Sequence, residues 1–215
     1  MYYWKCNNYS FDSTELSYIQ KLKINKLYIK LFEISPDEFY GAIPDSKTLL
    51  RLNTENSDGQ QKMILSKIKY VPVVFIKNEV FKNFNDSTLN WLSDNIIRLI
   101  DKYSGNDNFA DFDDKYDEIQ IDCDWTKSTK EKYFKLLRLL KVKSGLKISC
   151  TLRLYPYKYN NKLGIPPVDK VMLMCYNLVS PFNKNTNSIL DSRELGKYLN
   201  GNIKSIWNAA SERMF

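Results

Sequence analysis

The stretch EIQIDCDWT, Glu118 to Thr126, carries two aspartates, Asp122 and Asp124, with one residue between them. Because side chains along a strand alternate between its two faces, both carboxylates should emerge on the same side of a sheet. Two residues along a strand span about 6.6 Å. This is near the lower end of the distance between the two carboxyl groups of an inverting glycosidase and above that of a retaining one. The two groups would stack along the strand rather than flank a bond, so their spacing alone does not make them an acid and a base.

The sequence contains no histidine. This excludes Ser-His and Cys-His nucleophiles, histidine metal sites and imidazole bases, and leaves acid–base chemistry to carboxylates, tyrosine or lysine. Cys6, Cys123, Cys150 and Cys175 form no C-x-x-C pair, and each falls inside or at the end of a predicted strand. We expect buried free thiols, and we predict neither a metal nor a cofactor.

The composition predicts one globular domain over residues 1–215, with 43% hydrophobic residues to build its core. No apolar run approaches the roughly 18 residues of a transmembrane helix. The N-terminus lacks the charged and apolar regions of a signal peptide, although a secreted or surface-anchored parent stays an open alternative. The net charge of +7 comes from dispersed lysines without an arginine-rich patch, so no nucleic-acid partner is predicted.

Strands are predicted at residues 1–6, 26–34, 70–76, 118–126, 147–157 and 170–178, with helical segments between them, which indicates a parallel sheet. Capping patterns predict helix starts at Asp12 to Glu15, Ser128 to Glu131 and Asp191 to Glu194. Another helix is predicted from Ser87 to Tyr103. Residues 35–61 and 105–117 are expected to be polar connections, with a short helix near 62–68.

Six such units resemble most of a (β/α)₈ TIM barrel, although no seventh or eighth strand is evident. The alternative is an open, doubly wound sheet. A barrel that lacks two strands would have exposed sheet edges, which would favour self-association.

The predicted strands 118–126 and 147–157 each place apolar residues on one face and polar residues on the other. In a barrel the apolar face would meet the helices and the polar face would line the lumen. A buried Arg153 would need a carboxylate, so we expect it to pair with Asp122 or Glu118, with Lys30 in the same layer. Asp124 lies nearer the C-terminal end of its strand, where barrel enzymes place their chemistry, and is the better catalytic candidate.

Residues Ile119 to Thr126 resemble the fourth-strand signature of the chitinase family, glycoside hydrolase family 18, whose pattern is D-G-x-D-x-D-x-E. Asp122, Asp124 and Trp125 match it. The segment M-C-Y-N, Met174 to Asn177, resembles the M-x-Y-D that ends the sixth strand of that family. The whole chain also resembles an uncharacterised group of bacterial barrel proteins with glycoside-hydrolase character.

The resemblance implies that Asp124 orients the acetamido group of a glycan and that Tyr176 helps to hold it. The proton donor of the family, however, corresponds to Thr126, whose hydroxyl cannot act as a general acid near neutral pH. Ile119, Gln120 and Asn177 also depart from the family's pattern. The chitinase mechanism is therefore not expected to operate unchanged.

Two hypotheses remain. In the first, the chain is a glycosidase in which Asp124 acts with another strand-end carboxylate, Glu33 or Glu79. In the second, it is a non-catalytic carbohydrate-binding or scaffold protein. Both place a glycan or another small polar ligand at the strand ends, and ordinary packing stays an alternative for each aromatic ring. The residues expected to bind this ligand are Trp4, Glu33, Tyr155, Tyr157, Tyr176 and Asn177.

Overall fold

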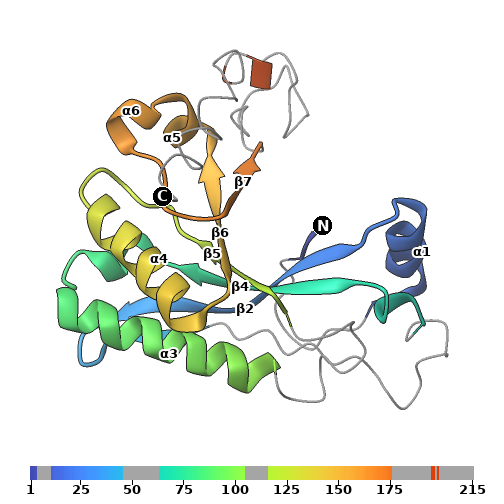
Figure 1. Ribbon diagram of the computed structural model, residues 1–215, viewed down its shortest axis with the longest axis horizontal. Coiled ribbons are helices and arrows are strands. Elements are labelled where there is room, and N and C mark those ends of the chain that lie inside the picture. The colour runs from blue at the N-terminus through green and yellow to red at the C-terminus, as the bar shows by residue number, and fades with distance from the viewer. Residues whose placement is uncertain (4–10, 46–62, 105–115, 176–194, 197, 199–215) are drawn as a thin grey trace.

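The computed structural model describes residues 1–3, 11–45, 63–104, 116–175, 195, 196 and 198. A seven-stranded sheet organises this part of the chain (Figure 1). Six strands run parallel to their neighbours in the order β1-β2-β4-β5-β6-β7, and β3 pairs antiparallel with β2. The strands are β1 (Tyr2–Tyr3), β2 (Lys26–Asp37), β3 (Gly41–Asp45), β4 (Lys69–Ile76), β5 (Glu118–Asp122), β6 (Lys147–Arg153) and β7 (Lys170–Met174).

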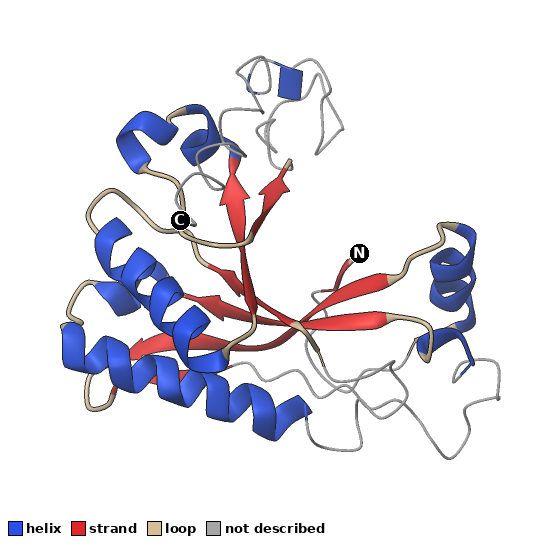
Figure 2. Ribbon diagram, viewed as in Figure 1, coloured by secondary structure: helices blue, strands red, loops and turns tan. Residues whose placement is uncertain are grey.

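Two long helices, α3 (Asp86–Ser104) and α4 (Lys130–Ser144), lie side by side along one face of the sheet (Figure 2). The other helices are α1 (Ser13–Lys21), the 3₁₀ helix η1 (Asn78–Phe81), α5 (Leu154–Lys158) and α6 (Asn160–Leu163), and residues 63–65 are also helical. None of the described helices combines the length and apolar content that a membrane span requires.

The capping predictions have mixed outcomes. The start of α1 is confirmed, because the Asp12 carboxylate accepts from the Glu15 backbone N–H at 2.8 Å and the Glu15 carboxylate accepts from the Asp12 N–H at 3.1 Å. The helix start at Ser128 to Glu131 is confirmed, because α4 begins at Lys130, but its N-cap residue is Thr129 and no side chain forms the expected capping bond. The pattern at Asp191 to Glu194 lies outside the described residues.

The described parallel strands follow one another in chain order, with no reversal among them. A doubly wound sheet requires such a reversal, so the order of the described strands contradicts that alternative. Within the described residues, β1 and β7 are the two ends of this path and do not pair with each other. The fold is therefore a mixed α/β structure with an open arc of sequential parallel strands.

Side-chain contacts across the sheet show that the arc is strongly concave. The Tyr2 hydroxyl of β1 donates to Asp122 of β5 at 3.2 Å, although β2 and β4 lie between these strands. In a flat sheet three strand spacings would separate them by about 14 Å. The sheet is therefore curved enough for side chains of β1 and β5 to meet on its concave face.

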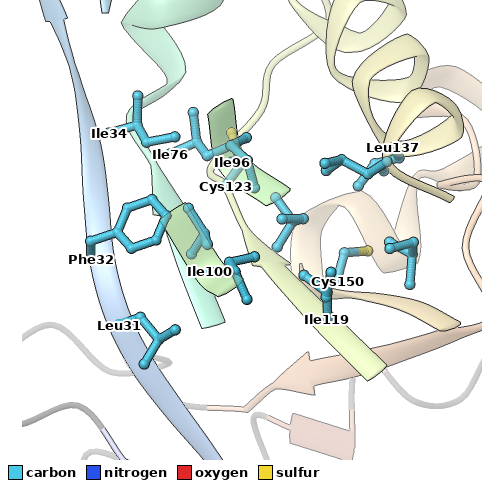
Figure 3. Packing of buried hydrophobic residues seen from close by; sticks show 14 of the residues in the cluster. Leu31, Phe32, Ile34, Ile76, Ile96, Ile100, Ile119, Cys123, Leu137 and Cys150 are labelled. Carbon is cyan, nitrogen blue, oxygen red and sulfur yellow. The ribbon is translucent and has the colours of Figure 1, made fainter. Parts of the chain in front are cut away.

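The alternation of faces predicted from sequence is confirmed. Ile119, Ile121 and Cys123 belong to the main hydrophobic core with Leu136 and Leu137 of α4. Figure 3 shows this packing, with Cys150 and Ile119 of neighbouring strands facing the same core. The opposite face holds buried polar residues: Glu118, Gln120, Asp122, Ser149 and Thr151.

The structure departs from the predicted elements at two strand ends. β2 continues to Asp37 and turns back through β3 in the segment expected to be a loop; the Asp37 carboxylate accepts from the N–H groups of Phe39 and Tyr40 in this turn. β6 ends at Arg153, and α5 begins at the next residue. The predicted strand 147–157 is therefore too long, and Tyr155 and Tyr157 lie on a helix.

Candidate functional site

The carboxyl ends of β5 and β6 bring Asp124 and Arg153 together. The Arg153 Nε donates to the Asp124 Oδ1 at 2.9 Å, and the two side chains are 54% and 51% exposed for Asp124 and Arg153 respectively. The predicted pairing of Arg153 with Asp122 or Glu118 is wrong. The physical reason is that Arg153 stands at the end of its strand, where it reaches a carboxylate in contact with water and avoids the cost of burying a charge.

Asp122 lies deeper on the concave face. Its carboxylate accepts from the Thr151 hydroxyl at 2.5 Å and from the Tyr2 hydroxyl at 3.2 Å. Burial raises its pKa, the hydrogen bond from Thr151 opposes this, and the negative charge of Asp124 adds to the rise. The sum is a carboxyl group whose pKa lies above its ordinary value.

Replacing Asp122 with asparagine is expected to change how stability depends on pH. Because the pKa of Asp122 is raised in the folded protein above its ordinary value of 3.8, the folded protein binds this proton more tightly than the unfolded chain. Its contribution is therefore fully present below that ordinary value and is lost as the pH rises through the folded-state pKa. Urea unfolding of both proteins from about pH 4 to pH 7 measures the difference. Parallel profiles for wild type and Asp122→Asn would contradict the assignment.

Thr126, at the position of the chitinase acid, belongs to a hydroxyl network at the start of α4. Its N–H donates to the Thr129 hydroxyl oxygen at 3.0 Å, and its own hydroxyl lies 3.0 Å from that of Ser128. The Thr129 hydroxyl also bonds the Asn78 side chain at 2.5 Å. Asn78 and Thr129 thus join the loops after β4 and β5, a link that sequence reasoning missed because its members lie 51 residues apart.

Glu33 is held by two lysines at the carboxyl end of β2. Its carboxylate lies 3.0 Å from Lys30 Nζ and 3.2 Å from Lys77 Nζ. Burial acts to raise the pKa of Glu33, but the hydrogen bonds and charges of both lysines outweigh it and lower the pKa. Lys30 thus forms an ion pair with Glu33, three residues along the same strand.

The other predicted carboxylate, Glu79, is exposed on η1. The adjoining residues Val80 and Phe81 are buried, which anchors this short helix to the core. Glu79 thus stands at the carboxyl end of β4, next in the sheet to the end of β5.

The aromatic residues predicted to bind a ligand are separated by the structure. Tyr155 is 61% exposed and its ring centroid lies 4.7 Å from that of Tyr159, whereas Tyr157 is buried. Trp125 is also buried and packs against Tyr133 and Phe134 on α4, so it belongs to the core. Trp4, Tyr176 and Asn177 lie outside the described residues.

Another carboxylate cluster lies at the opposite end of the concave face. Glu118 accepts from Lys26 at 3.0 Å, from Lys170 at 3.1 Å and from the Tyr28 hydroxyl at 3.2 Å. These residues come from the beginnings of β2, β5 and β7, so the cluster ties three strands together at their N-terminal ends. In a barrel this end serves stability rather than chemistry.

Among the described side chains, no three histidine, cysteine, aspartate or glutamate residues gather in a way that could hold a metal ion. Cys123 and Cys150 are buried free thiols and Cys175 is a partly buried one, while Cys6 lies outside the described residues. Burial raises the pKa of Cys150 to about 12, so this thiol is poorly suited to nucleophilic chemistry.

No protein-family model matches the sequence, and comparison with curated proteins gives no match. Among solved structures, the spore cortex-lytic enzyme SleL of Bacillus cereus is similar with a TM-score of 0.45 and 18% identity, over 79% of this chain and 40% of that one. The ICChI chitinase from Ipomoea carnea is similar with a TM-score of 0.46 and 13% identity, over 87% of this chain and 70% of that one. The chain thus spans well under half of the first of these proteins. Similarity at this level carries no conclusion about residues or activity.

Proposed function

We propose that this chain binds glycans at the carboxyl ends of β5 and β6 and does not hydrolyse them. The observation that carries the proposal is the ion pair between Asp124 and Arg153, both half-exposed, whose Oδ1 and Nε atoms lie 2.9 Å apart. Arg153 is the residue directly before α5. A carboxylate accepts hydrogen bonds and a guanidinium donates them, so the pair offers both functions to neighbouring sugar hydroxyls. The exposed Tyr155 ring, two residues beyond Arg153, offers an apolar face for a sugar ring.

The side chains around this pair favour binding over hydrolysis. Glycoside hydrolysis requires a protonated carboxyl group at the leaving oxygen and a second carboxylate. Thr126 supplies only a hydroxyl at the position where the resemblance to chitinases implies the acid. Glu33 is kept ionised by Lys30 and Lys77, which makes it a poor proton donor.

Hydrolysis is the second candidate, and the raised pKa of Asp122 favours it, because a carboxyl group that keeps its proton can act as a general acid. In this case Asp122 would protonate the leaving group while Asp124 or Glu79 supplied the second carboxylate. The burial of Asp122 beneath Tyr2 and Thr151 weighs against direct contact with a substrate. Asp122 is therefore better suited to positioning the Asp124 loop.

Substitutions at the pair test where the glycan binds. On immobilised chitin, peptidoglycan and cellulose oligosaccharides, Asp124→Asn should weaken binding about tenfold, because it removes a charge-assisted hydrogen bond. Tyr155→Ala should weaken it about threefold to tenfold through lost ring contact.

Two variants serve as matched controls. Asp94→Asn removes an exposed aspartate of another ion pair, that with Lys143 on the helical side, and Tyr18→Ala removes another exposed ring. Both should bind as wild type does. If they weaken binding as much as Asp124→Asn and Tyr155→Ala, the site lies elsewhere.

A further inference from the structure

A cavity of about 240 Å³ lies between the β2–β3 hairpin and α3. Ile34 and Ala42 of the hairpin and Leu92 and Ile96 of α3 form its apolar walls. Ile34 and Ile96 both belong to the main hydrophobic core (Figure 3). The cavity is therefore on the helix-covered side of the sheet, opposite the concave face that carries Asp122.

Two exposed aromatic residues stand at the mouth of this cavity. Tyr40, on the turn that leads into β3, and Trp91, on α3, both line it and both expose much of their side chains to water. Phe39, beside Tyr40, is 89% exposed. Large exposed rings that adjoin an apolar cavity mark a binding site more often than isolated surface residues do.

Among the described residues that line the cavity, Arg98 is the one charged group. The Asn95 amide is occupied, because it donates to the Trp91 carbonyl at 2.9 Å and accepts from Arg98 Nη2 at 2.9 Å. A guanidinium has five N–H donors, and Arg98 uses one of them for Asn95 within the described part of the chain. In the described part of the chain, no carboxylate pairs with Arg98.

Among the described strands β3 pairs with β2 alone, and its other edge is poorly suited to an added strand. Ile34 is opposite Pro44 in the register, and the Ile34 carbonyl accepts from the Lys77 N–H on the β4 side. The backbone of Ile34 therefore points towards β4, so the backbone nitrogen of Pro44 points to the outer edge of β3 and has no N–H to donate. A proline at this position removes a backbone donor that an added strand would need. This argues against a peptide or a second copy of the chain that binds by strand pairing.

We propose that this cavity binds a small amphipathic monoanion, a compound with one aromatic or short alkyl group and one carboxylate. The apolar group would lie in the cavity against its apolar walls and Trp91, and the carboxylate would pair with Arg98. A neutral sugar fits less well, because its many hydroxyls need partners that the apolar walls do not supply. This site is separate from the proposed glycan site and does not depend on it.

The test uses 4-phenylbutyrate as the probe and 4-phenyl-1-butanol as its neutral analogue, each titrated into the ¹⁵N-labelled chain by NMR. We expect saturable shifts in α3 and β3, with tighter binding of the acid than of the alcohol. Arg98→Met should weaken binding of the acid about threefold to tenfold, in keeping with an exposed ion pair, and leave binding of the alcohol unchanged. Trp91→Ala should weaken binding of both.

Arg138→Met is the matched control, because Arg138 is an exposed arginine on α4 that does not line the cavity. It should leave both affinities unchanged, and melting curves check that each variant is folded. Equal affinity for the acid and the alcohol, or no effect of Arg98→Met, would overturn the proposal. Self-association that Trp91→Ala abolishes and that the probe does not displace would also overturn it, because this face would then be an interface between copies.

Discussion

Truncation of Phe81 to alanine is expected to lower the free energy of unfolding by about 3–5 kcal/mol. Phe81 is fully buried at the end of η1, and its ring meets that of Tyr133 on α4 edge to face at a centroid distance of 5.8 Å. Truncation removes this contact and leaves a cavity between η1 and α4 that the rigid elements around it cannot fill. Equilibrium urea unfolding, monitored by circular dichroism, measures the change.

Phe39→Ala provides the control, because it removes the same atoms from a side chain that is 89% exposed. It should change stability by less than about 0.5 kcal/mol. Comparable effects of the two substitutions would mean that η1 is not packed as described. The packing matters for the candidate site, because η1 begins with Asn78, whose side chain holds Thr129 at the end of the β5 loop.

Replacement of Glu118 by glutamine is expected to lower the free energy of unfolding by about 2–3 kcal/mol. The Glu118 side chain is 2% exposed and accepts bonds from two lysines and from Tyr28. Glutamine has nearly the same shape and keeps an acceptor oxygen, but it lacks the negative charge, so the attraction to both lysines is weakened. The loss is smaller than for a fully buried pair, because Lys26 and Lys170 are partly exposed and water can solvate them.

The effect of Glu118→Gln should disappear in acid. Burial acts to raise the pKa of Glu118, but hydrogen bonds, including those from both lysines, outweigh it and lower the pKa below 4.5. The stabilisation is therefore present above this ordinary value and is lost as the pH falls through the folded-state pKa. Urea unfolding of wild type and Glu118→Gln from neutral to acidic pH should show their free energies of unfolding converge at low pH. This dependence on pH has the opposite sign to that expected for Asp122.

Glu131→Gln is the control for Glu118→Gln. Glu131 also pairs with a lysine, Lys130, but its side chain is 78% exposed. Exposed pairs contribute little, so we expect a change below about 0.5 kcal/mol. If Glu118→Gln were as mild as Glu131→Gln at neutral pH, the cluster that joins β2, β5 and β7 would not stabilise the sheet.

The alternation of residue types predicted the faces of the sheet correctly. Ile119 and Ile121 pack against the helices and Asp122 faces the concave side, because a period of two is a local property of extended backbone. The positions where strands end were harder to predict. Leu154 to Tyr157 continue an alternating apolar pattern, yet they form α5, since the same pattern also fits one turn of helix.

The partners of the charged residues could not be predicted from the faces. Asp122 and Asp124 lie on the same face of their strand, so the sequence could not show which of them Arg153 would contact. That choice depends on depth: Asp122 remains in the buried part of the sheet, and Asp124 lies beyond the end of β5 at the level of Arg153. The β3 hairpin was missed because its residues 35–45 have the polar, proline-containing composition of a loop.

The most direct test of the central claim is a calorimetric titration of the wild-type chain with chitin and peptidoglycan oligosaccharides, followed by chromatography of the contents of the cell. The account predicts saturable binding of at least one of these glycans, weakened by Asp124→Asn but not by Asp94→Asn, with every oligosaccharide recovered at its original length. Shortened products that accumulate with time in the wild-type sample but not with Asp124→Asn would contradict it and identify a hydrolase. Absence of binding to any of these oligosaccharides would contradict the glycan site itself.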